Sequence, residues 1–348
     1  EVARCAGVSR TTVSLVLNNS PIPAEKTRIK VLAVVKELNY QPDPIFQQAF
    51  RRRATRLDGV PSATRTIGFL APPDLLDRAQ RDDGYYSRVL AGIQRAIEQH
   101  HYHLMWKTAK TDASMLPEMV TEHRVDGLLI EGNFPEIVRS LLAKRLPVVF
   151  IDRCYPDLEV SSVMPNVERA IHEQLEYLWE LGHRNIATFQ HAAPLVLHIE
   201  MCLRAFRGFF AGKNHPVPQP HLCEPRDITS ETHAQVMAEF ARQIAAARPR
   251  PTALITWDVY ACALLIEFQK LGLRVPEEIS VIGMDDTIAA RLSRPQLTSY
   301  RFPMDEMGRS ATELLIQRIQ DRNRPVRHIQ INGQLAERAS CVAVSSEQ

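Results

Sequence analysis

Two segments near the start of the chain carry apolar residues at helical spacing. Val13, Val16 and Leu17 share one face of a helix predicted from Arg10 to Asn18. A further amphipathic helix is predicted from about Glu25 to Leu38, with an apolar face made of Val31, Val34, Val35 and Leu38. Together with a short helix before them, these segments predict a small helical domain at the start of the chain.

The residues between the first two helices favour a tight turn. Gly7 closes the short helix that contains Val2, Ala3 and Ala6, because only glycine adopts a left-handed C-cap without steric cost. Ser9 is a good N-cap for the next helix. The pattern predicts a helix-turn-helix whose second helix suits the major groove of DNA. An ordinary helical hairpin without a DNA-binding role is the alternative.

From Thr66 onward the pattern changes to strands that alternate with helices. Predicted strands of the first set lie at 67–70, 103–107, 127–130 and 148–151. A second set of strands and helices begins near Asn166. This rhythm predicts an α/β core of parallel sheets that helices cover on both faces.

Composition and charge indicate that the chain has two parts with different roles. The chain has 348 residues, too many for one ordinary core, and 45% apolar and 24% charged residues are typical of a soluble globular protein. Residues 1–65 hold eleven Lys or Arg against five Asp or Glu, a net charge of +6, and the remainder carries −4. A basic segment on a mildly acidic body indicates a nucleic-acid-binding module joined to another domain.

The six cysteines are scattered and include no C-x-x-C pair. This pattern indicates buried thiols in a reducing compartment, and it argues against a metal cluster. No signal peptide is apparent, nor is an apolar run long enough to span a membrane. We therefore expect a cytoplasmic protein.

Several motifs along the chain resemble those of one family. Ala-x-x-Ala-Gly-Val-Ser-x-x-Thr-Val-Ser begins at Ala3, and Leu-Asn-Tyr-x-Pro begins at Leu38. Four core motifs follow in order: VDGL from Val125, LGHRxIA from Leu181, ISVIGxDD from Ile279 and PxLT from Pro295. Each is weak alone, but together they resemble the LacI/GalR family of bacterial repressors over nearly the whole chain.

The resemblance implies three parts and their partners. The expected parts are a helix-turn-helix headpiece (1–42), a hinge helix and linker (43–65), and an effector-binding and dimerisation core (66–342) that resembles a periplasmic sugar-binding protein. By analogy the core has an amino-terminal subdomain (66–164 plus 296–322) and a carboxyl-terminal one (165–295 plus 323–342). A homodimer on double-stranded operator DNA near the nucleoid is expected, controlled by a small-molecule effector, with a sugar or sugar derivative as first choice, and without a cofactor.

The outer face of the second helix is the expected DNA contact. We expect Arg10, Thr11 and Leu15 to reach base edges, where Leu15 can sit against a thymine methyl group. The resemblance implies that Thr27 and Tyr40 contact the DNA backbone, although Tyr40 can equally be a packed aromatic residue at a helix end. The full set of expected DNA-binding residues is Ser9, Arg10, Thr11, Thr12, Ser14, Leu15, Asn18, Thr27, Tyr40, Ala49 and Phe50.

The predicted hinge helix departs from the family. Asp43-Pro44 is a helix start, and Ala49 stands where the resemblance implies a leucine that wedges between base steps in the minor groove. A methyl group is too small for that role. Either the operator is less kinked, or Phe46 or Phe50 supplies the wedge; packing of both rings within the protein is the alternative.

Candidate effector-binding residues follow predicted strands of the core. Ligands of open parallel sheets bind at the carboxyl ends of the strands. Asp152 and Asp285 match family effector positions, Trp257 stands where many members have asparagine, and Arg204 is the nearest candidate for the family's effector arginine. The expected set is Tyr85, Tyr86, Asp152, Arg204, Trp257 and Asp285. Carboxylates accept hydroxyl hydrogens and an aromatic face covers the apolar side of a sugar ring.

Other classes of function remain as alternatives. Asp285 and Asp286 are adjacent, so their side chains point to opposite sides of a strand end and cannot easily flank one bond as an acid–base pair. The sequence shows no nucleophile–base pattern, phosphate loop or metal-ligand spacing, so we expect no catalytic or metal site and no enzyme. A regulator controlled by a partner protein and a solute-binding module of the transport type are the alternatives to a repressor with a small-molecule effector.

Overall fold

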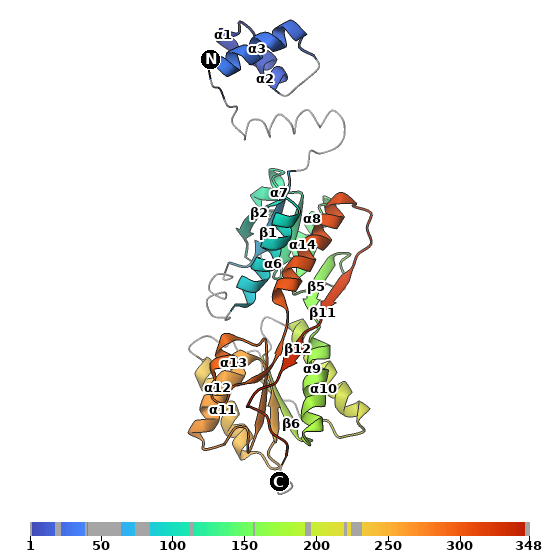
Figure 1. Cartoon of the computed structure of the whole chain (residues 1–348). Coiled ribbons are helices and arrows are strands. Elements are labelled where there is room, and N and C mark those ends of the chain that lie inside the picture. The colour runs from blue at the N-terminus through green and yellow to red at the C-terminus, as the bar shows by residue number, and fades with distance from the viewer. Residues whose placement is uncertain are drawn as a thin grey trace. The chain divides into compact units, whose positions relative to one another are not determined.

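The computed structural model describes most of the chain, in two compact units, residues 1–64 and residues 65–348. The described residues are 2–17, 22–38, 40, 64–73, 84–110, 115–155, 157–191, 196–218, 221–223 and 232–344. The predicted hinge helix, with Ala49 and Phe50, lies outside the described residues, as does Asn18. Each unit is described below by itself (Figure 1).

The first unit, the headpiece, contains the predicted helix-turn-helix. Its helices are α1 (Val2–Cys5), α2 (Arg10–Leu17) and α3 (Glu25–Glu37). Gly7 adopts a left-handed φ of 59°, and the backbone N–H of Thr12 donates to Ser9 Oγ at 3.0 Å, which caps α2. A small core holds the three helices together and consists of Val2, Ala6, Val13, Val16 and Val31. The turn and cap predicted from the sequence are therefore present.

The second unit, the core, contains two six-stranded sheets. The first sheet has the strand order β11-β5-β4-β3-β1-β2, and each pairing within it is parallel. Its strands are β1 (Thr66–Ala71), β2 (His103–Thr108), β3 (Gly127–Glu131), β4 (Val148–Ile151), β5 (Ser161–Pro165) and β11 (His328–Ile331). The four central strands are almost entirely apolar and buried, as expected for a sheet covered on both faces.

The second sheet repeats this plan with one exception. Its strand order is β12-β10-β9-β8-β6-β7, and only the pairing of β10 with β12 is antiparallel among those described. The strands are β6 (Ile186–His191), β7 (His221–Cys223), β8 (Ala253–Ile255), β9 (Ser280–Met284), β10 (Thr298–Arg301) and β12 (Gln334–Ala336). The doubly covered parallel sheets predicted from the sequence are confirmed.

Helices cover both faces of each sheet (Figure 1). On the first sheet, α6 (Tyr85–Gln99) and α14 (Met304–Gln320) pack on one face, and α7 (Glu118–Thr121) and α8 (Pro135–Ala143) on the other. On the second sheet, α9 (Val167–Glu180) and α10 (Val196–Gly212) face α11 (His233–Ala246), α12 (Asp258–Lys270) and α13 (Ile288–Leu292) across the strands. Among the described helices, none is long and apolar enough to cross a membrane.

Two glycines let α6 and α14 approach backbone to backbone. A Cβ atom added at Gly92 would lie 1.9 Å from the carbonyl oxygen of Asp305, and one added at Gly308 would lie 2.1 Å from that of Val89. No side chain fits at either position. The close packing fixes the start of α6, which carries Tyr85 and Tyr86, against the first sheet.

The placement of two strands corrects the expected subdomain boundaries. The sequence predicts residues 296–322 in the amino-terminal subdomain and 323–342 in the other. Instead, β10 pairs with β9 in the second sheet, and β11 pairs with β5 in the first sheet. The chain therefore crosses between the sheets after β5, after β10 and after β11. Both are four-residue strands of mixed polar and apolar residues, TSYR and HIQI, which fit either sheet, so the sequence pattern could not place these two.

Candidate DNA interface and effector site

The residues predicted to reach DNA bases lie on the outer side of α2. Arg10 and Thr11 are exposed in its first turn, and Leu15 is half-buried one turn later. Val13 and Val16 point the other way, into the headpiece core. Because helical neighbours three or four residues apart share a face, Arg10, Thr11 and Leu15 can contact one surface together.

Four more of the predicted DNA-binding residues lie in the headpiece, at α2 and at the start of α3. Ser9 Oγ lies 2.9 Å from Thr12 Oγ1, so both hydroxyls are held at the start of α2, and Ser14 is half-buried. Thr27 is half-buried in the first turn of α3, where its N–H donates to the carbonyl oxygen of Ala24 at 2.9 Å.

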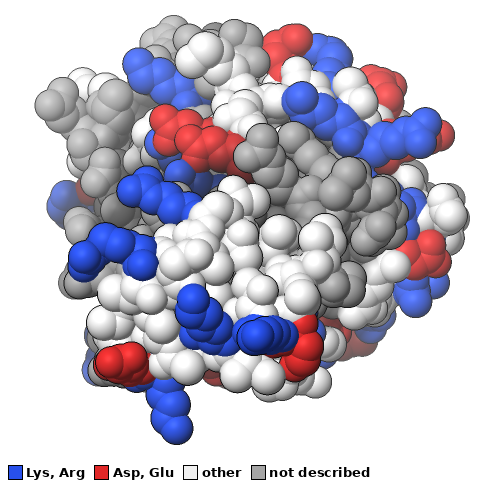
Figure 2. Space-filling view, turned by 90° about the horizontal axis from the view of Figure 1, so that it is seen from above, with Lys and Arg blue, Asp and Glu red and all other residues white. Residues whose placement is uncertain are grey.

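Tyr40 follows α3, and its ring is exposed. The N–H of Tyr40 donates to the carbonyl oxygen of Val35 at 3.0 Å, while 44% of the residue remains exposed. It is therefore not a buried packing residue within the described headpiece. Seen from above, the chain shows Lys and Arg side chains more prominently than Asp and Glu, with uncharged surface between them (Figure 2).

In the core, Asp152 is the centre of a buried polar cluster. It follows the last residue of β4 with a left-handed φ of 61°, and only 16% of its side chain is exposed. His198, from the first turn of α10, places Nε2 3.2 Å from Asp152 Oδ1. This is ion-pair distance for a protonated imidazole, but the contact lacks the direction of a hydrogen bond. Since β4 belongs to the first sheet and α10 covers the second, the contact joins the two subdomains.

Tyr85 completes the cluster with a buried hydroxyl group. Neither Tyr85 OH nor His198 Nε2 has a hydrogen-bond partner among the described residues, although both are buried. Burial of the hydroxyl, with the charges of Asp152 and Glu131, raises the pKa of Tyr85 well above its usual value. Tyr85 is therefore a permanent hydrogen-bond donor next to a carboxylate. We call Tyr85, Asp152 and His198 the Asp152 cluster.

Tyr86 and Glu131 support this cluster from behind. The rings of Tyr85 and Tyr86 pack edge to face with centroids 4.8 Å apart. Tyr86 is fully buried and its hydroxyl donates to Glu131 Oε1 at 3.1 Å, at the end of β3. Tyr86 thus orients Tyr85 rather than presenting a hydroxyl of its own.

On the second sheet, Asp285 and Asp286 form a strained turn directly after β9. Both have left-handed backbone conformations, with φ of 105° and 51°. Asp285 is half-buried, and Arg88 of α6 donates from Nη2 to its carbonyl oxygen at 3.3 Å, a second contact between the subdomains. The Asp286 side chain is fully buried and ion-paired with arginines, so it is not available to a ligand.

Trp257 lies at the start of α12, where it is half-buried. Its Nε1 donates to Gln190 Oε1 at 3.1 Å, at the carboxyl end of β6, and this bond fixes the plane of the indole ring.

The next residue, Asp258, is buried, and burial raises the pKa of its carboxyl group to about 6. Asp258 accepts from Ser299 Oγ at 2.7 Å and from the N–H of Thr287 at 2.7 Å, so it supports the Asp285–Asp286 turn.

Comparison with known proteins decides the family. Residues 1–43 match the model of bacterial regulatory proteins of the lacI family, and residues 175–341 match the periplasmic binding protein-like domain. An HTH-type transcriptional repressor PurR from Vibrio vulnificus (strain CMCP6) is 31% identical, covering 97% of this chain and 96% of the relative. The chain belongs to the LacI family of bacterial regulatory proteins.

Other relatives and solved structures agree with this membership. PurR of Photobacterium profundum is 29% identical over 98% of this chain and 97% of its own. The lac repressor dimer bound to operator and the anti-inducer ONPF has a TM-score of 0.69 with 24% identity, and covers 98% of each chain. A CelR–cellobiose complex has a TM-score of 0.66 with 24% identity, covering 97% of this chain and 98% of its own. This LacI-family chain is a DNA-binding transcriptional regulator.

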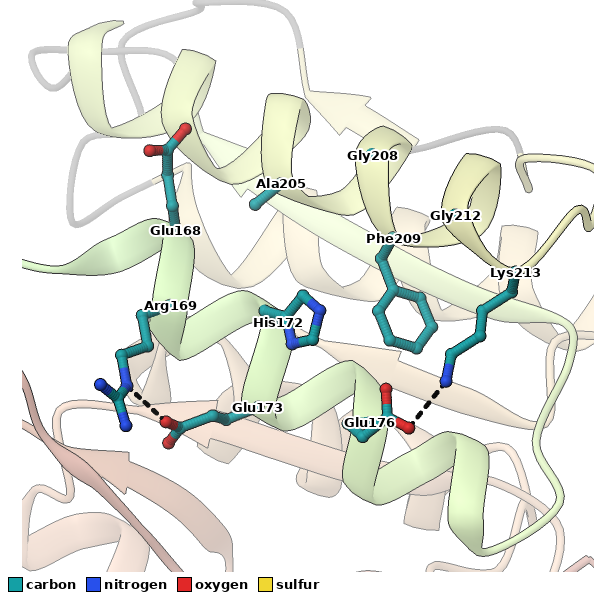
Figure 3. Close-up of a pocket in the computed structure, with 10 residues that line it drawn as sticks. All are labelled: Glu168, Arg169, His172, Glu173, Glu176, Ala205, Gly208, Phe209, Gly212 and Lys213. Carbon is teal, nitrogen blue, oxygen red and sulfur yellow. Dashed lines mark hydrogen bonds and ion pairs between the residues drawn. The ribbon is translucent and has the colours of Figure 1, made fainter.

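Arg204 does not lie with the other predicted effector residues. Its side chain is 71% exposed on α10, and Nε pairs with Glu168 Oε1 at 2.5 Å. Its partner Glu168 lines a groove of about 820 Å³ between α9 and α10, in which Arg169 pairs with Glu173 and Lys213 Nζ with Glu176 Oε1 at 2.7 Å (Figure 3). This groove shares no residue with the Asp152 cluster, so the contacts of Arg204 give no support to its expected role in effector binding.

Two residues of the site were missed by reasoning from the sequence. Glu131 follows four apolar residues of a predicted strand, so its place at a strand's carboxyl end was a usable signal. His198 offered no such signal, because it lies in a helix 46 positions after Asp152 and meets it only through the tertiary fold.

Proposed function

We propose that this LacI-family regulator is a homodimeric repressor whose affinity for a roughly palindromic operator is changed by a small, hydroxyl-rich molecule bound at the Asp152 cluster. The observation that carries the effector proposal is the pair of buried polar atoms, Tyr85 OH and His198 Nε2, without hydrogen-bond partners among the described residues. Buried polar groups in folded proteins are almost always paired. A ligand that supplies a partner accounts for Tyr85 OH, and it also offers a hydrogen bond to His198 Nε2, whose contact within the protein is the ion pair with Asp152.

The chemistry of the cluster favours neutral hydroxyl groups. Asp152 accepts hydrogen bonds, Tyr85 donates one, and the indole of Trp257 offers an apolar face at the end of the second sheet. A carbohydrate or a related polyol matches this combination of acceptors, donors and aromatic surface. Asp285 is the acceptor on the side of the second sheet.

The operator is read by α2. Arg10 is suited to guanine, Thr11 to several bases, and Leu15 to a thymine methyl group. Substitution of Leu15 by arginine should change the preferred half-site, because a hydrogen-bond donor replaces an apolar contact. Selection on random operators tests this, and the same consensus for wild type and Leu15→Arg would show that Leu15 does not read bases.

The dimer contact lies on α12 and α13. These two helices pack together and expose apolar side chains, with Val259 57%, Ile266 56%, Ile288 56% and Leu292 69% exposed. Val259 and Ile266 are seven residues apart on one face of α12, and Ile288 and Leu292 are four apart on α13. Such a contiguous apolar face is typical of a subunit interface. Ile288→Asp should yield monomers in sedimentation experiments, whereas Val217→Asp, at an exposed apolar position elsewhere in the core, should not.

A ligand screen tests the effector proposal directly. The purified chain is heated with sugars, polyols, nucleosides and sugar phosphates, and a true effector at a hundred times its dissociation constant adds about 2.7 kcal/mol of stability. The stabilising compound should also change operator affinity, and its effect should weaken in Tyr85→Phe. A compound that stabilises Tyr85→Phe and Asp152→Ala as strongly as wild type would place its site elsewhere.

A further inference from the structure

The strained turn after β9 is held by two buried carboxylates, Asp258, which is described above, and Asp286. Asp285 and Asp286 are consecutive non-glycine residues with left-handed φ, a conformation that persists only when the surrounding contacts impose it. The contacts come mostly from Asp286. Its N–H donates to Ser299 Oγ at 3.0 Å, and its side chain is completely buried.

Three arginines surround this carboxylate. Oδ2 of Asp286 accepts from Arg291 Nη2 at 2.9 Å and from Arg301 Nε at 2.5 Å, and Oδ1 accepts from Arg338 Nη2 at 2.5 Å. Arg291 Nη2 also donates to the carbonyl oxygen of Asp286 at 3.0 Å. Charge-assisted bonds of this kind are among the strongest in proteins and fix both partners in direction.

The three arginines come from three structural elements, and their bonds to Asp286 connect these elements to the turn. Arg291 belongs to α13, whose outer face carries Ile288 and Leu292 of the proposed dimer contact. Arg301 is the last residue of β10, directly before the chain crosses to α14 and the first sheet. Arg338 follows β12 and also donates to the carbonyl oxygen of Leu297 at 2.6 Å.

The same turn faces the effector site from the other side. Asp285 precedes Asp286 directly, and its carbonyl oxygen accepts from Arg88 of α6 across the subdomain boundary. The backbone of both residues is fixed by hydrogen bonds, from Asp285 N–H to the carbonyl oxygen of Tyr300 at 2.8 Å and from Asp286 N–H to Ser299 Oγ, so a displacement of Asp285 by a ligand strains the contacts of Asp286. From Asp286 the shortest route to the dimer face is its pair of bonds to Arg291.

We infer that Asp286 is a positioning residue that holds Asp285 toward the effector, and that Arg291 couples occupancy of that site to the dimer helix α13. The inference rests on the proposed function, since it concerns regulation through the same site. It assigns no ligand contact to Asp286 or Arg291. Both act through the turn.

Arg291→Gln is the main test, because Asp286 keeps Arg301 and Arg338 and the side chain of Arg291 is already 45% exposed. The matched control is Arg294→Gln, whose guanidinium donates only to the nearby carbonyl oxygens of Leu292 and Ser293 among the contacts described. We measure operator affinity of the full chain with and without the stabilising compound found by the screen. Arg291→Gln should reduce the ratio of the two affinities at least fivefold, while Arg294→Gln should leave it unchanged.

Ligand affinity separates coupling from binding. In Arg291→Gln the compound should bind within about threefold of wild type, because Asp285 stays in place. In Asp286→Asn it should bind at least tenfold more weakly, and Asp286→Glu should restore part of that loss. A wild-type affinity ratio in Arg291→Gln, or a wild-type ligand affinity in a folded Asp286→Asn, would overturn the inference.

Amide hydrogen exchange tests the contact between Arg291 and the Asp285–Asp286 turn without any ligand. In Arg291→Gln the amides of Asp286 to Ala290 should exchange faster than in wild type and in Arg294→Gln, while those of β4 and α10 should not change. Equal exchange in the two variants would contradict the coupling role of Arg291. If wild type shows no ligand response at all, the proposed function fails instead, and the exchange result still decides whether Arg291 holds the turn.

Discussion

In each sheet of the core, aspartates directly follow one central strand, and we call each of these places a corner. The two corners differ in whether their buried polar atoms have hydrogen-bond partners within the protein. Asp152 follows β4 and Asp285–Asp286 follow β9, all three with left-handed φ. Beside Asp152, Tyr85 OH and His198 Nε2 are buried without hydrogen-bond partners among the described residues. Beside Asp285, the Asp286 carboxylate accepts from three arginines. The same residue type at equivalent places thus serves two different roles.

The difference shows how to separate a ligand site from a structural anchor. A buried polar atom without a partner costs free energy of desolvation, so a folded protein retains it where something else supplies the partner. A carboxylate with every oxygen occupied has no capacity left for a ligand. The contrast supports the proposal that the effector binds at the Asp152 cluster and that Asp286 stabilises the fold around it.

The largest expected effect is on stability, from Asp286. Asp286→Asn removes the charge that balances three arginines, so the free energy of unfolding should fall by about 3 kcal/mol, as for other buried ion pairs that lose one partner. Urea denaturation measures the loss. Asp152→Asn serves as the comparison and should cost clearly less, because Asp152 is partly exposed and weakly paired. Equal losses would mean that both corners are structural anchors.

The next effect is on ligand binding, and it should appear at the other corner. Asp152→Ala should weaken effector binding by about 1.5–3 kcal/mol, the usual value for a hydrogen bond to a charged group. Asp285→Ala should weaken it similarly. Calorimetry with the compound from the screen measures both, and operator binding by each variant without the compound should match wild type. A variant that keeps full ligand affinity removes its residue from the site.

A smaller effect is expected from the hydroxyl group of Tyr85, whose removal should weaken effector binding without lowering stability. Tyr85→Phe removes a buried hydroxyl that has no partner among the described residues, so the free energy of unfolding should not fall. Effector binding should weaken by about 0.5–1.5 kcal/mol, because one hydrogen bond is lost. Thermal denaturation with and without the compound measures both quantities. A clear loss of stability without ligand would show that Tyr85 OH already has a partner.

The smallest expected effect is a dependence of stability on pH, which also differs between the corners. Burial lowers the pKa of His198, but the interactions with the Asp152 carboxylate together outweigh burial, so that the pKa of His198 is raised from 6.5. The stabilising contribution of His198 is therefore complete below about pH 6.5 and is lost as the pH rises through the higher folded value. His198→Gln should remove this change from the pH profile of thermal stability.

Asp286 should titrate in the opposite sense. Burial opposes its ionisation, yet the hydrogen bonds from Arg291, Arg301 and Arg338 together lower the pKa of Asp286 below 3.8. Its contribution to stability is complete above about pH 3.8 and is lost only as the pH falls further. Asp258, in the same corner, has a pKa raised to about 6 by burial and also senses the charge of Asp286, so the effect of Asp286→Asn is judged in the acidic range. A profile in which Asp286→Asn leaves the acidic range unchanged, or in which His198→Gln changes the acidic range alone, would contradict this assignment of the two corners.

Much of the fold followed from local patterns in the sequence. Gly7 and Ser9 specify the turn and cap of the headpiece through their own backbone preferences, and apolar runs specify the buried strands of the sheets. The sheet to which β10 and β11 belong could not be predicted, since a four-residue strand of mixed polar and apolar residues fits either sheet equally well. That choice is decided by pairing partners far away in the sequence.

The site was predictable only where residues follow strands. Asp152 and Asp285 were proposed because they follow predicted strands, whose carboxyl ends bind ligands in parallel sheets, and because they match family effector positions. Arg204 was assigned from sequence register alone. It lies six residues after His198 in α10, and six residues of helix turn the side chain by about 600°, which is about 240° beyond one full turn. The side chains of Arg204 and His198 therefore point to different sides of α10. His198, which meets Asp152, could not be distinguished from any other helical histidine before the fold was known.

The most direct test of the contrast between the two corners is operator binding, measured by fluorescence anisotropy with and without the stabilising compound, in wild type and Asp152→Ala. We predict that the compound changes the operator affinity of wild type at least fivefold. Asp152→Ala should bind the operator as wild type does without the compound and should respond only at concentrations tenfold higher or more. An undiminished response of Asp152→Ala at the wild-type concentration would contradict the placement of the effector at the Asp152 cluster.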